Sequence, residues 1–410
     1  MNPEPETPTS RSLPAVSSRG ARLLLVAALI LVGINLRPAI SSVAAILAAI
    51  RAGTGMSSAQ AGILTTLPVM CFGLFAPLAP RLTARATPER IVLIGLLALA
   101  VGLIARIFFG VPGLFAGSVV AGGSIGVIMV LLPGIIKRDF PQRLGLMTGL
   151  YTMALCLGAA LAAGATVPVQ HLAGDSWRIA LAFWALPALL AAWAWWPQLR
   201  QPAHRAASGR FRVHGMYRSG LAWQVTFFMG LQSSLAYCVF GWLPTMLIDR
   251  GMDPLTAGLG LSLSIGMQLV TSLAGPWLAM RGRDQRASIA LMLFLTVIGL
   301  LGCLYAPLAS AWLWIVLLGL GQGGNFSIGL TLIVLRAPNP QTTAELSGMA
   351  QGIGYVLAAF GPFLVGILHD ATGGWHGAAV LFTAISAAAL LAGWRAGRNV
   401  HVQARVEMLD

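Results

Sequence analysis

One arginine stands in the middle of a long apolar segment. Arg37 lies in Gly33-Ile34-Asn35-Leu36-Arg37-Pro38, within a run from about Ala21 to Ile50 that is mostly Leu, Ile, Val and Ala. As a helix this run is roughly 45 Å long, against about 30 Å for the hydrocarbon core of a bilayer. A guanidinium at mid-bilayer costs at least about 2.5–3.5 kcal/mol even on lenient insertion scales, so something must offset that cost.

Two interpretations of Arg37 follow from its surroundings in the sequence. Pro38 lacks an N–H and disfavours helical geometry at the preceding residue, which predicts a break in the helix. The arginine either binds an anionic or strongly dipolar substrate with its planar set of donors, or caps the carbonyl groups freed at the break. We favour substrate binding because no Asp or Glu lies in the middle of any expected span to pair with the charge. The same absence argues against an exporter of cationic drugs.

Polar residues in other apolar segments are candidates to complete a binding site. Asn35 precedes Arg37 by two residues, so an unbroken helix would project the two side chains about 160° apart. Gln322 and Asn325 are three residues apart and share a helix face. Hydrogen bonds between helices are the alternative role for the amides. With Arg37, the candidate substrate-binding residues are Asn35, Tyr151, Gln232, Tyr237, Gln268, Gln322, Asn325, Gln351 and Tyr355.

Two other polar positions are expected to lie near the membrane surface. Arg106 comes late in its apolar segment, where its side chain is expected to snorkel to the interface. His369 and Asp370 are interpreted as an exposed loop junction rather than a protonatable functional pair. The four cysteines lie far apart inside apolar segments, so we expect small core residues rather than a disulfide or metal framework.

Composition places these residues in an integral membrane protein. Of 410 residues, 57% are hydrophobic and only 9% are charged, compared with about 25% charged in soluble domains. The net charge of +14 comes from arginines in short loops without interleaved aromatics, so nucleic-acid binding is not expected. Runs of about twenty apolar residues without alternation exclude a transmembrane barrel. Twelve spans are predicted, over 21–50, 57–79, 90–109, 113–136, 144–170, 177–196, 219–247, 254–280, 287–306, 310–335, 345–369 and 376–396.

Basic residues predict the orientation of the spans. One set of alternating loops, together with both tails, carries nearly all the arginines and Lys137, the only lysine. The other set carries only Arg51, Arg178 and Arg250. Cytoplasmic loops are enriched in Lys and Arg, so both termini are expected in the cytoplasm.

The chain divides into two similar halves. A polar, basic connection over residues 197–218 separates six spans from six. Short matches recur at an offset of about 200 residues; one pairs Gly33-x-Asn35 with Gly230-x-Gln232. The predicted organisation is a disordered N-terminal tail, a six-helix bundle, a cytoplasmic linker, a second six-helix bundle and a C-terminal tail, over 1–19, 20–196, 197–218, 219–396 and 397–410.

These features resemble the major facilitator superfamily. The loops from Ala76 to Arg85 and from Gly275 to Asp284 are similar to its Gly-x-x-x-Asp-Arg-x-Gly-Arg-Arg loop, although the first copy lacks the usual Asp. Within the superfamily, the chain is similar to the cyanate and 2-nitroimidazole (CynX/NimT) transporter family. The stretches that carry this likeness are Asn35-Leu36-Arg37-Pro38, Ile136-Lys137-Arg138-Asp139-Phe140-Pro141, Gly230-Leu231-Gln232-Ser233 with Trp242-Leu243-Pro244, and Leu346-Ser347-Gly348-Met349-Ala350-Gln351 with Gly361-Pro362.

The sequence therefore predicts an all-α secondary transporter rather than an enzyme. Two pseudo-symmetric bundles of six helices would alternately expose a central site to each side of the membrane. The resemblance implies a small anionic or polar substrate, cyanate-like or nitro-aromatic. No cofactor or metal is expected, since no nucleotide-binding or hydrolase motif occurs. We expect a monomeric, multi-pass permease of a bacterial-type inner membrane, whose partners are its small-molecule substrate and the lipid bilayer.

Two alternatives from other functional classes remain, besides a multidrug-type efflux transporter without a fixed anion site. A membrane receptor would need a partner domain, for which the tails are short. A channel is disfavoured by the absence of charged rings.

Overall fold

The computed structural model describes residues 19–56, 58–200 and 210–409. The N-terminal tail predicted as disordered and the middle of the predicted linker, residues 201–209, lie outside the described residues. Within the described part of the chain, eleven helical segments are long and apolar enough to cross a membrane. A shorter apolar helix, Ile63–Phe75, occupies the second predicted span, so the count of twelve is accounted for.

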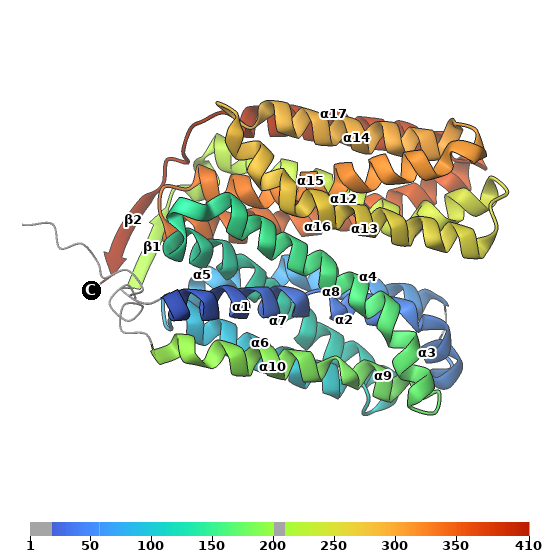
Figure 1. Cartoon of the computed structure of the whole chain (residues 1–410), viewed down its shortest axis with the longest axis horizontal. Helices are drawn as coiled ribbons and strands as arrows, with labels where there is room; N and C mark the ends of the chain where they lie inside the picture. The colour runs from blue at the N-terminus through green and yellow to red at the C-terminus, as the bar shows by residue number, and fades with distance from the viewer. Residues whose placement is uncertain (1–18, 57, 201–209, 410) are drawn as a thin grey trace, which may run out of the picture.

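The helices form two bundles that lie side by side (Figure 1). The first bundle runs from blue to green in the figure and the second from yellow-green to red. The helices of the first bundle are α1 (Arg19–Asn35), α2 (Pro38–Ala45), α3 (Leu47–Thr54), α4 (Ser58–Phe75), α5 (Leu78–Thr83), α6 (Pro88–Ala105), α7 (Gly110–Asp139), η1 (Pro141–Arg143), α8 (Leu144–Leu172), α9 (Trp177–Phe183), α10 (Ala185–Trp195) and η2 (Trp196–Arg200). Those of the second are η3 (Met216–Arg218), α12 (Gly220–Asp249), α13 (Pro254–Arg281), α14 (Arg286–Tyr305), η4 (Leu308–Ser310), α15 (Ala311–Arg336), α16 (Pro340–Thr372) and α17 (His376–Ala396).

Several helix starts follow from capping residues. Thr87, Asp253 and Asn339 each precede a proline at the first helical position, where the missing N–H costs nothing. Their side chains accept hydrogen bonds from backbone N–H groups three residues on, at 3.4, 3.0 and 2.8 Å respectively. These caps start α6, α13 and α16.

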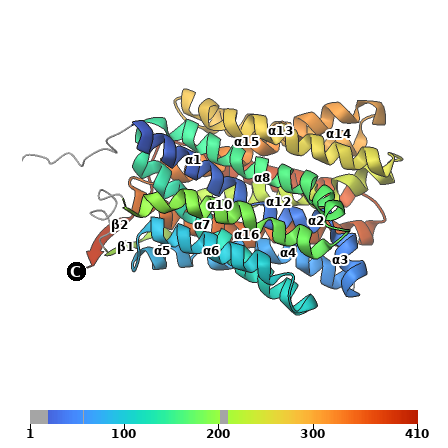
Figure 2. The ribbon, with the colours of Figure 1, turned by 60° about the horizontal axis from the view of Figure 1, so that its bottom comes forward.

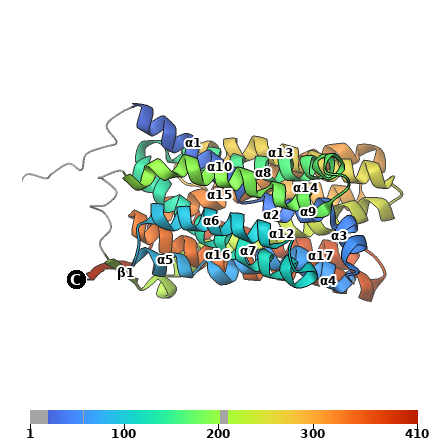
Figure 3. The same cartoon turned by 90° about the horizontal axis from the view of Figure 1, so that it is seen from below.

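The first span is built from three helices instead of one. The predicted break at Pro38 separates α1 from α2, and a second interruption at Ile46, with φ −121° and ψ 24°, separates α2 from α3. Figure 3 shows α1, α2 and α3 succeeding one another along the length of the molecule. Pro38 cannot donate to the carbonyl of Ile34, and Gly158 of α8 packs against that carbonyl. A Cβ at residue 158 would lie 1.9 Å from the Ile34 oxygen, so this approach requires glycine.

A small sheet joins the connection between the bundles to the end of the chain. Strand β1 (Arg210–His214) pairs antiparallel with β2 (Arg405–Leu409), with Arg212 opposite Glu407. Figures 1 and 2 show this sheet at one end of the helices, which we call the tail face; the opposite end is the far face. The sequence did not lead us to expect strands in the linker or in the C-terminal tail.

The bundles meet through helices from both halves of the chain. Helix α8 packs on α13, and α16 packs on α4 and α7. Near the far face, a separate apolar cluster holds only residues of the first bundle, among them Val43, Ile50, Leu114 and Trp177.

Candidate functional site

Arg37 occupies the break in the first span, at the junction of the two bundles. It is the N-cap residue of α2, and its backbone lies at φ −114° and ψ −27°. Its guanidinium carbon lies 5.2 Å from the centroid of the Phe326 ring on α15, a cation–π contact across the bundles. The side chain is half-buried, and its Nε has no hydrogen-bond partner among the described residues. The arginine therefore keeps a donor available for a ligand.

Three tyrosines and a cysteine lie near this guanidinium. Tyr151 and Cys156 come from α8, Tyr237 from α12 and Tyr355 from α16, and all four interact electrostatically with Arg37. The Tyr355 ring meets that of Tyr237 edge-on, with centroids 6.5 Å apart. The hydroxyl groups of Tyr151 and Tyr355 are buried and lack hydrogen-bond partners within the described ranges. Buried polar groups are normally satisfied, so these hydroxyls are suited to a polar ligand beside the arginine.

Side-chain hydrogen bonds join the two bundles on the tail side of Arg37. Thr152 donates to the Ser272 carbonyl at 2.8 Å, and the Cys156 thiol lies 3.4 Å from the Ser272 hydroxyl. Gln351 donates to the Met129 carbonyl at 3.1 Å. These bonds join α8 to α13 and α7 to α16.

Lys137 also joins the two bundles, in the last turn of α7 near the tail face. Its ammonium group at the end of α7 donates to the Val334 carbonyl at 2.7 Å and to the Ala337 carbonyl. These two acceptors lie at the end of α15, where carbonyl groups lack helical partners and carry the negative end of the helix dipole. Together with Thr152 and Gln351, Lys137 holds the bundles together between the tail face and the level of Arg37.

The predicted amides lie in the interior but bond mainly to one another and to their own bundle. Gln268 donates to Gln322 at 3.2 Å, and Asn325 donates to Thr296 of α14 at 3.0 Å. Gln322 and Asn325 share a helix, as predicted, but their bonds run to different neighbouring helices. Asn35 turns its amide nitrogen back to the Leu31 carbonyl, at 2.8 Å. Gln232 likewise donates locally, to the Met229 carbonyl and the Ser233 hydroxyl.

The structure thus brings part of the predicted set together. One cluster contains Arg37, Tyr151, Tyr237 and Tyr355. Gln351 instead takes part in the hydrogen bonds that join the bundles on the tail side of Arg37. Sequence reasoning missed Phe326, Cys156 and Ser272. An aromatic ring in an apolar helix gives no sign that it faces a charge, so Phe326 had no signal beyond its place one residue after Asn325.

The expectation that Arg106 reaches the membrane interface is wrong. Its side chain is 0% exposed, and its Nη1 donates to the Ala39 carbonyl of α2 at 2.7 Å. Arg106 ends α6, and α7 begins only four residues later, so α7 covers the arginine from the other side. Gly117 of α7 lies directly against its side chain.

The interpretation of His369 as an exposed loop residue is also wrong. Its ring packs against those of Trp242 and Trp375, with centroids 6.3 and 4.4 Å away. Its Nε2 is 3.7 Å from a carboxylate oxygen of Asp249. Asp249 also accepts a hydrogen bond from Trp375 at 3.1 Å, so the cluster ties the far ends of α12 and α16 together.

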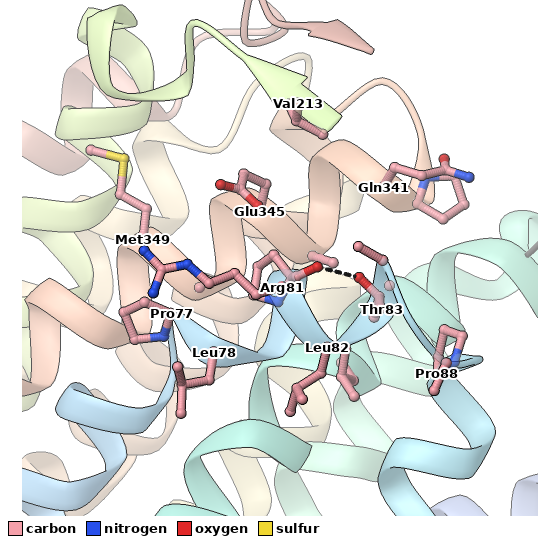
Figure 4. A pocket seen from close by; sticks show the side chains of 18 of the residues that line it. Pro77, Leu78, Arg81, Leu82, Thr83, Pro88, Val213, Gln341, Glu345 and Met349 are labelled. Atoms are coloured by element: carbon pink, nitrogen blue, oxygen red, sulfur yellow. Dashed lines mark hydrogen bonds between the residues drawn. The ribbon is translucent and has the colours of Figure 1, made fainter. Parts of the chain in front are cut away.

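A separate cavity of about 720 Å³ opens at the tail face (Figure 4). Its walls come from α5, α7, α16 and the segment around β1, and Arg81 and Glu345 both line it. These two residues belong to opposite bundles. Tyr217 lines it as well, and burial together with the nearby Glu345 carboxylate raises the pKa of Tyr217, which therefore remains a neutral donor. The cavity lies where the bundles and the linker meet, apart from the Arg37 cluster.

Comparison with known proteins gives the family. A model described as Major Facilitator Superfamily matches residues 23–359 and 225–407. The chain is 39% identical over 379 residues to the uncharacterized transporter YycB of Bacillus subtilis (strain 168), covering 92% of this chain and 94% of the relative. It is 38% identical over 387 residues to the 2-nitroimidazole transporter of Escherichia coli (strain K12), covering 93% and 97%. It is 34% identical over 352 residues to the cyanate transport protein CynX of the same organism, covering 85% and 90%.

Solved structures agree at the level of the fold. The proton:xylose symporter XylE superposes with a TM-score of 0.75 at 13% sequence identity, over 91% of this chain and 95% of the other. Since the family model spans most of the sequence and three relatives match along nearly their whole lengths, the chain belongs to the Major Facilitator Superfamily of membrane transporters.

Proposed function

We propose that this secondary transporter carries a small anionic or strongly polar solute, such as cyanate or a nitro-aromatic compound, and that Arg37 binds its negative end. The observation that carries the proposal is the half-buried guanidinium with an unpartnered Nε, next to two buried hydroxyl groups that also lack partners in the described residues. An anion would neutralise the arginine and accept these hydrogen bonds. The names of two relatives support the substrate class.

The aromatic residues of the site bear on the shape of the substrate. The Phe326 ring lies against the cation, and the rings of Tyr237 and Tyr355 meet edge-on near it. Such surroundings suit a flat, delocalised anion or a nitro group, whose charge is spread over several atoms. In this proposal Gln232, Gln268, Gln322 and Asn325 do not bind directly in the described conformation but supply amides when the second bundle closes on the ligand.

We propose that, in this conformation, the substrate reaches Arg37 from the far face. The cross-bundle hydrogen bonds described above lie between the tail face and the level of Arg37. We propose that the tail face is cytoplasmic, as the distribution of arginines predicts. The substrate would then reach Arg37 from the outside, and rocking of the bundles would release it inside.

Uptake by purified protein in liposomes tests the proposal. Radiolabelled cyanate and 2-nitroimidazole are measured in parallel with Arg37→Ala and Arg37→Lys. Loss of a charged hydrogen bond is worth about 1.5–3 kcal/mol, so Arg37→Ala is expected to lower uptake at low substrate concentration by about 10- to 150-fold. Arg37→Lys keeps the charge but lacks the planar arrangement of donors, so it is expected to retain only part of the transport activity.

Arg178→Ala serves as the matched control. This arginine is exposed near the far face and rests on the Trp177 ring at 5.2 Å, so its removal is expected to leave uptake unchanged. Full transport by Arg37→Ala would refute the role of Arg37. Transport of neutral and cationic drugs that is insensitive to Arg37 would favour the multidrug alternative.

A further inference from the structure

Arg106 is a second buried arginine, in addition to the one at the candidate site. Its side chain is fully buried, and its Nε and Nη2 have no hydrogen-bond partner in the described part of the chain. Within the described residues, the guanidinium makes one hydrogen bond, from Nη1 to the Ala39 carbonyl at 2.7 Å. Burying a guanidinium with a single hydrogen-bond partner costs free energy, so the position of that partner indicates what the arginine does in the fold.

This hydrogen bond is made to α2, a short helix of the first span that depends on its neighbours for its position. Helix α2 has only eight residues and is bounded by the break at Arg37 and the interruption at Ile46. A helix of that length is not stable alone and takes its position from its neighbours. Ala39 lies in its first turn, two residues after Arg37. Arg106 therefore connects the end of α6 to the turn of α2 that follows the candidate site.

The backbone around Arg37 depends on where this turn lies. The Arg37 carbonyl accepts hydrogen bonds from the N–H groups of Ile40 and Ser41, at 3.0 and 3.2 Å. A rotation or shift of α2 would thus be transmitted to the Arg37 backbone and to the direction of its side chain. Gly117 allows α7 to approach Arg106 closely, since a Cβ there would lie 2.8 Å from the Arg106 Cγ. This close packing restricts the position of the Arg106 side chain.

We infer that Arg106 is a positioning residue for substrate binding, which holds α2 through the Ala39 carbonyl and thereby directs Arg37 into the site. This inference rests on the proposed function of Arg37. It assigns to Arg106 an effect on substrate affinity and little effect on the rate of the conformational change.

The test compares Arg106→Met with Arg106→Lys in the liposome assay, using radiolabelled cyanate and 2-nitroimidazole. Methionine fills similar space but cannot donate a hydrogen bond. KM is therefore expected to rise about tenfold, which corresponds to a loss of roughly 1.4 kcal/mol in binding free energy. Vmax per folded protein is expected to change less than about twofold. Lysine retains a donor, so KM is expected to return to within about threefold of the wild type. A fall in Vmax with unchanged KM, or no rescue by lysine, would overturn the inference.

A double-mutant cycle separates this role from a general loss of structure. If Arg106 acts through Arg37, Arg106→Met should raise KM much less in an Arg37→Lys background than in the wild type. Independent, additive effects would contradict the inference even if Arg37 itself binds substrate. If Arg37→Ala alone leaves KM unchanged, the proposed function fails instead. Arg178→Met controls for the loss of an arginine from the same bundle, and the thermal midpoint of each variant reports whether it is folded.

Discussion

At the scale of single residues, the candidate site combines a fixed charge with polar groups that have no hydrogen-bond partner among the described residues. The Tyr355 hydroxyl is buried without a partner in the described ranges, so its removal should not cost a hydrogen bond within the protein. In the proposed complex it would donate to the substrate. The two effects have opposite signs and can be measured separately.

We therefore expect Tyr355→Phe to keep or slightly raise the thermal midpoint while lowering substrate affinity. A neutral hydrogen bond is worth about 0.5–1.5 kcal/mol, so KM should rise about two- to tenfold. Tyr305→Phe is the control, since the Tyr305 hydroxyl bonds to His376 at 2.9 Å in an exposed position away from Arg37. An unchanged KM in Tyr355→Phe would remove this hydroxyl from the site.

Residue chemistry was predictable from the sequence where charge and polarity were isolated. Arg37 stood out because no carboxylate shares its depth in the membrane, and three tyrosines of the cluster were among the candidates. Arg106 was misjudged because its burial depends on how sharply the chain turns between α6 and α7. That turn includes Phe109 with φ 60°, a left-handed backbone conformation that is not expected for phenylalanine from the sequence.

At the scale of elements, the broken first span depends on its neighbour α8. Gly158 lets α8 approach the Ile34 carbonyl, to which Pro38 cannot donate the usual helical hydrogen bond. Gly158→Ala is expected to push α8 away from the break, with a loss of about 1–3 kcal/mol in stability and a clear loss of transport. Differential scanning fluorimetry and uptake would measure the two effects.

The same helix contains a matched control. A Cβ added at Gly164 would meet no neighbouring atom within 4 Å, so alanine there projects into open space. Replacing a helical glycine by alanine is expected to be neutral or to add about 0.5–1 kcal/mol of stability. Equal behaviour of the two alanine variants would mean that the close approach at Gly158 does not matter.

Element boundaries were predictable to the extent that local residues encode them. Proline predicted the break after Arg37, and the capping residues before Pro88, Pro254 and Pro340 fit the observed helix starts. The interruption at Ile46 has no proline or glycine to mark it. The pairing of β1 with β2 joins segments nearly two hundred residues apart, and such a contact cannot be found from local pattern alone.

At the scale of the whole molecule, we expect the hydrogen bonds of Lys137 to hold the two bundles together near the tail face. Its bonds to the end of α15 must break when the tail face opens. Hydrogen bonds from a charged group are worth about 1.5–3 kcal/mol, so Lys137→Gln is expected to shift the equilibrium toward the tail-open state by about tenfold or more. Arg143→Gln, an exposed change nearby on the tail face, should leave the equilibrium unchanged.

Cys156 offers a native reporter of that shift. It lies at the junction of α8 and α13, on the path that the opening would expose, whereas Cys71, Cys238 and Cys303 are buried. In inside-out vesicles, a membrane-impermeant maleimide should modify Cys156 faster in Lys137→Gln than in the wild type. The Lys137→Gln variant with Cys156→Ala identifies the modified residue. Equal labelling rates would show that Lys137 does not hold the tail face closed.

The isolation of Arg37 also has an electrical consequence. With a monovalent anion bound, the proposed site is neutral, but the empty site carries one positive charge through the conformational change. A charge that crosses the whole membrane field gains or loses about 2.3 kcal/mol per 100 mV. With the tail face inside and the interior negative, the voltage would favour the empty carrier open to the inside. Exchange of anion for anion should then be insensitive to voltage, whereas net uptake should slow as the interior becomes more negative, because the empty carrier must return against the field.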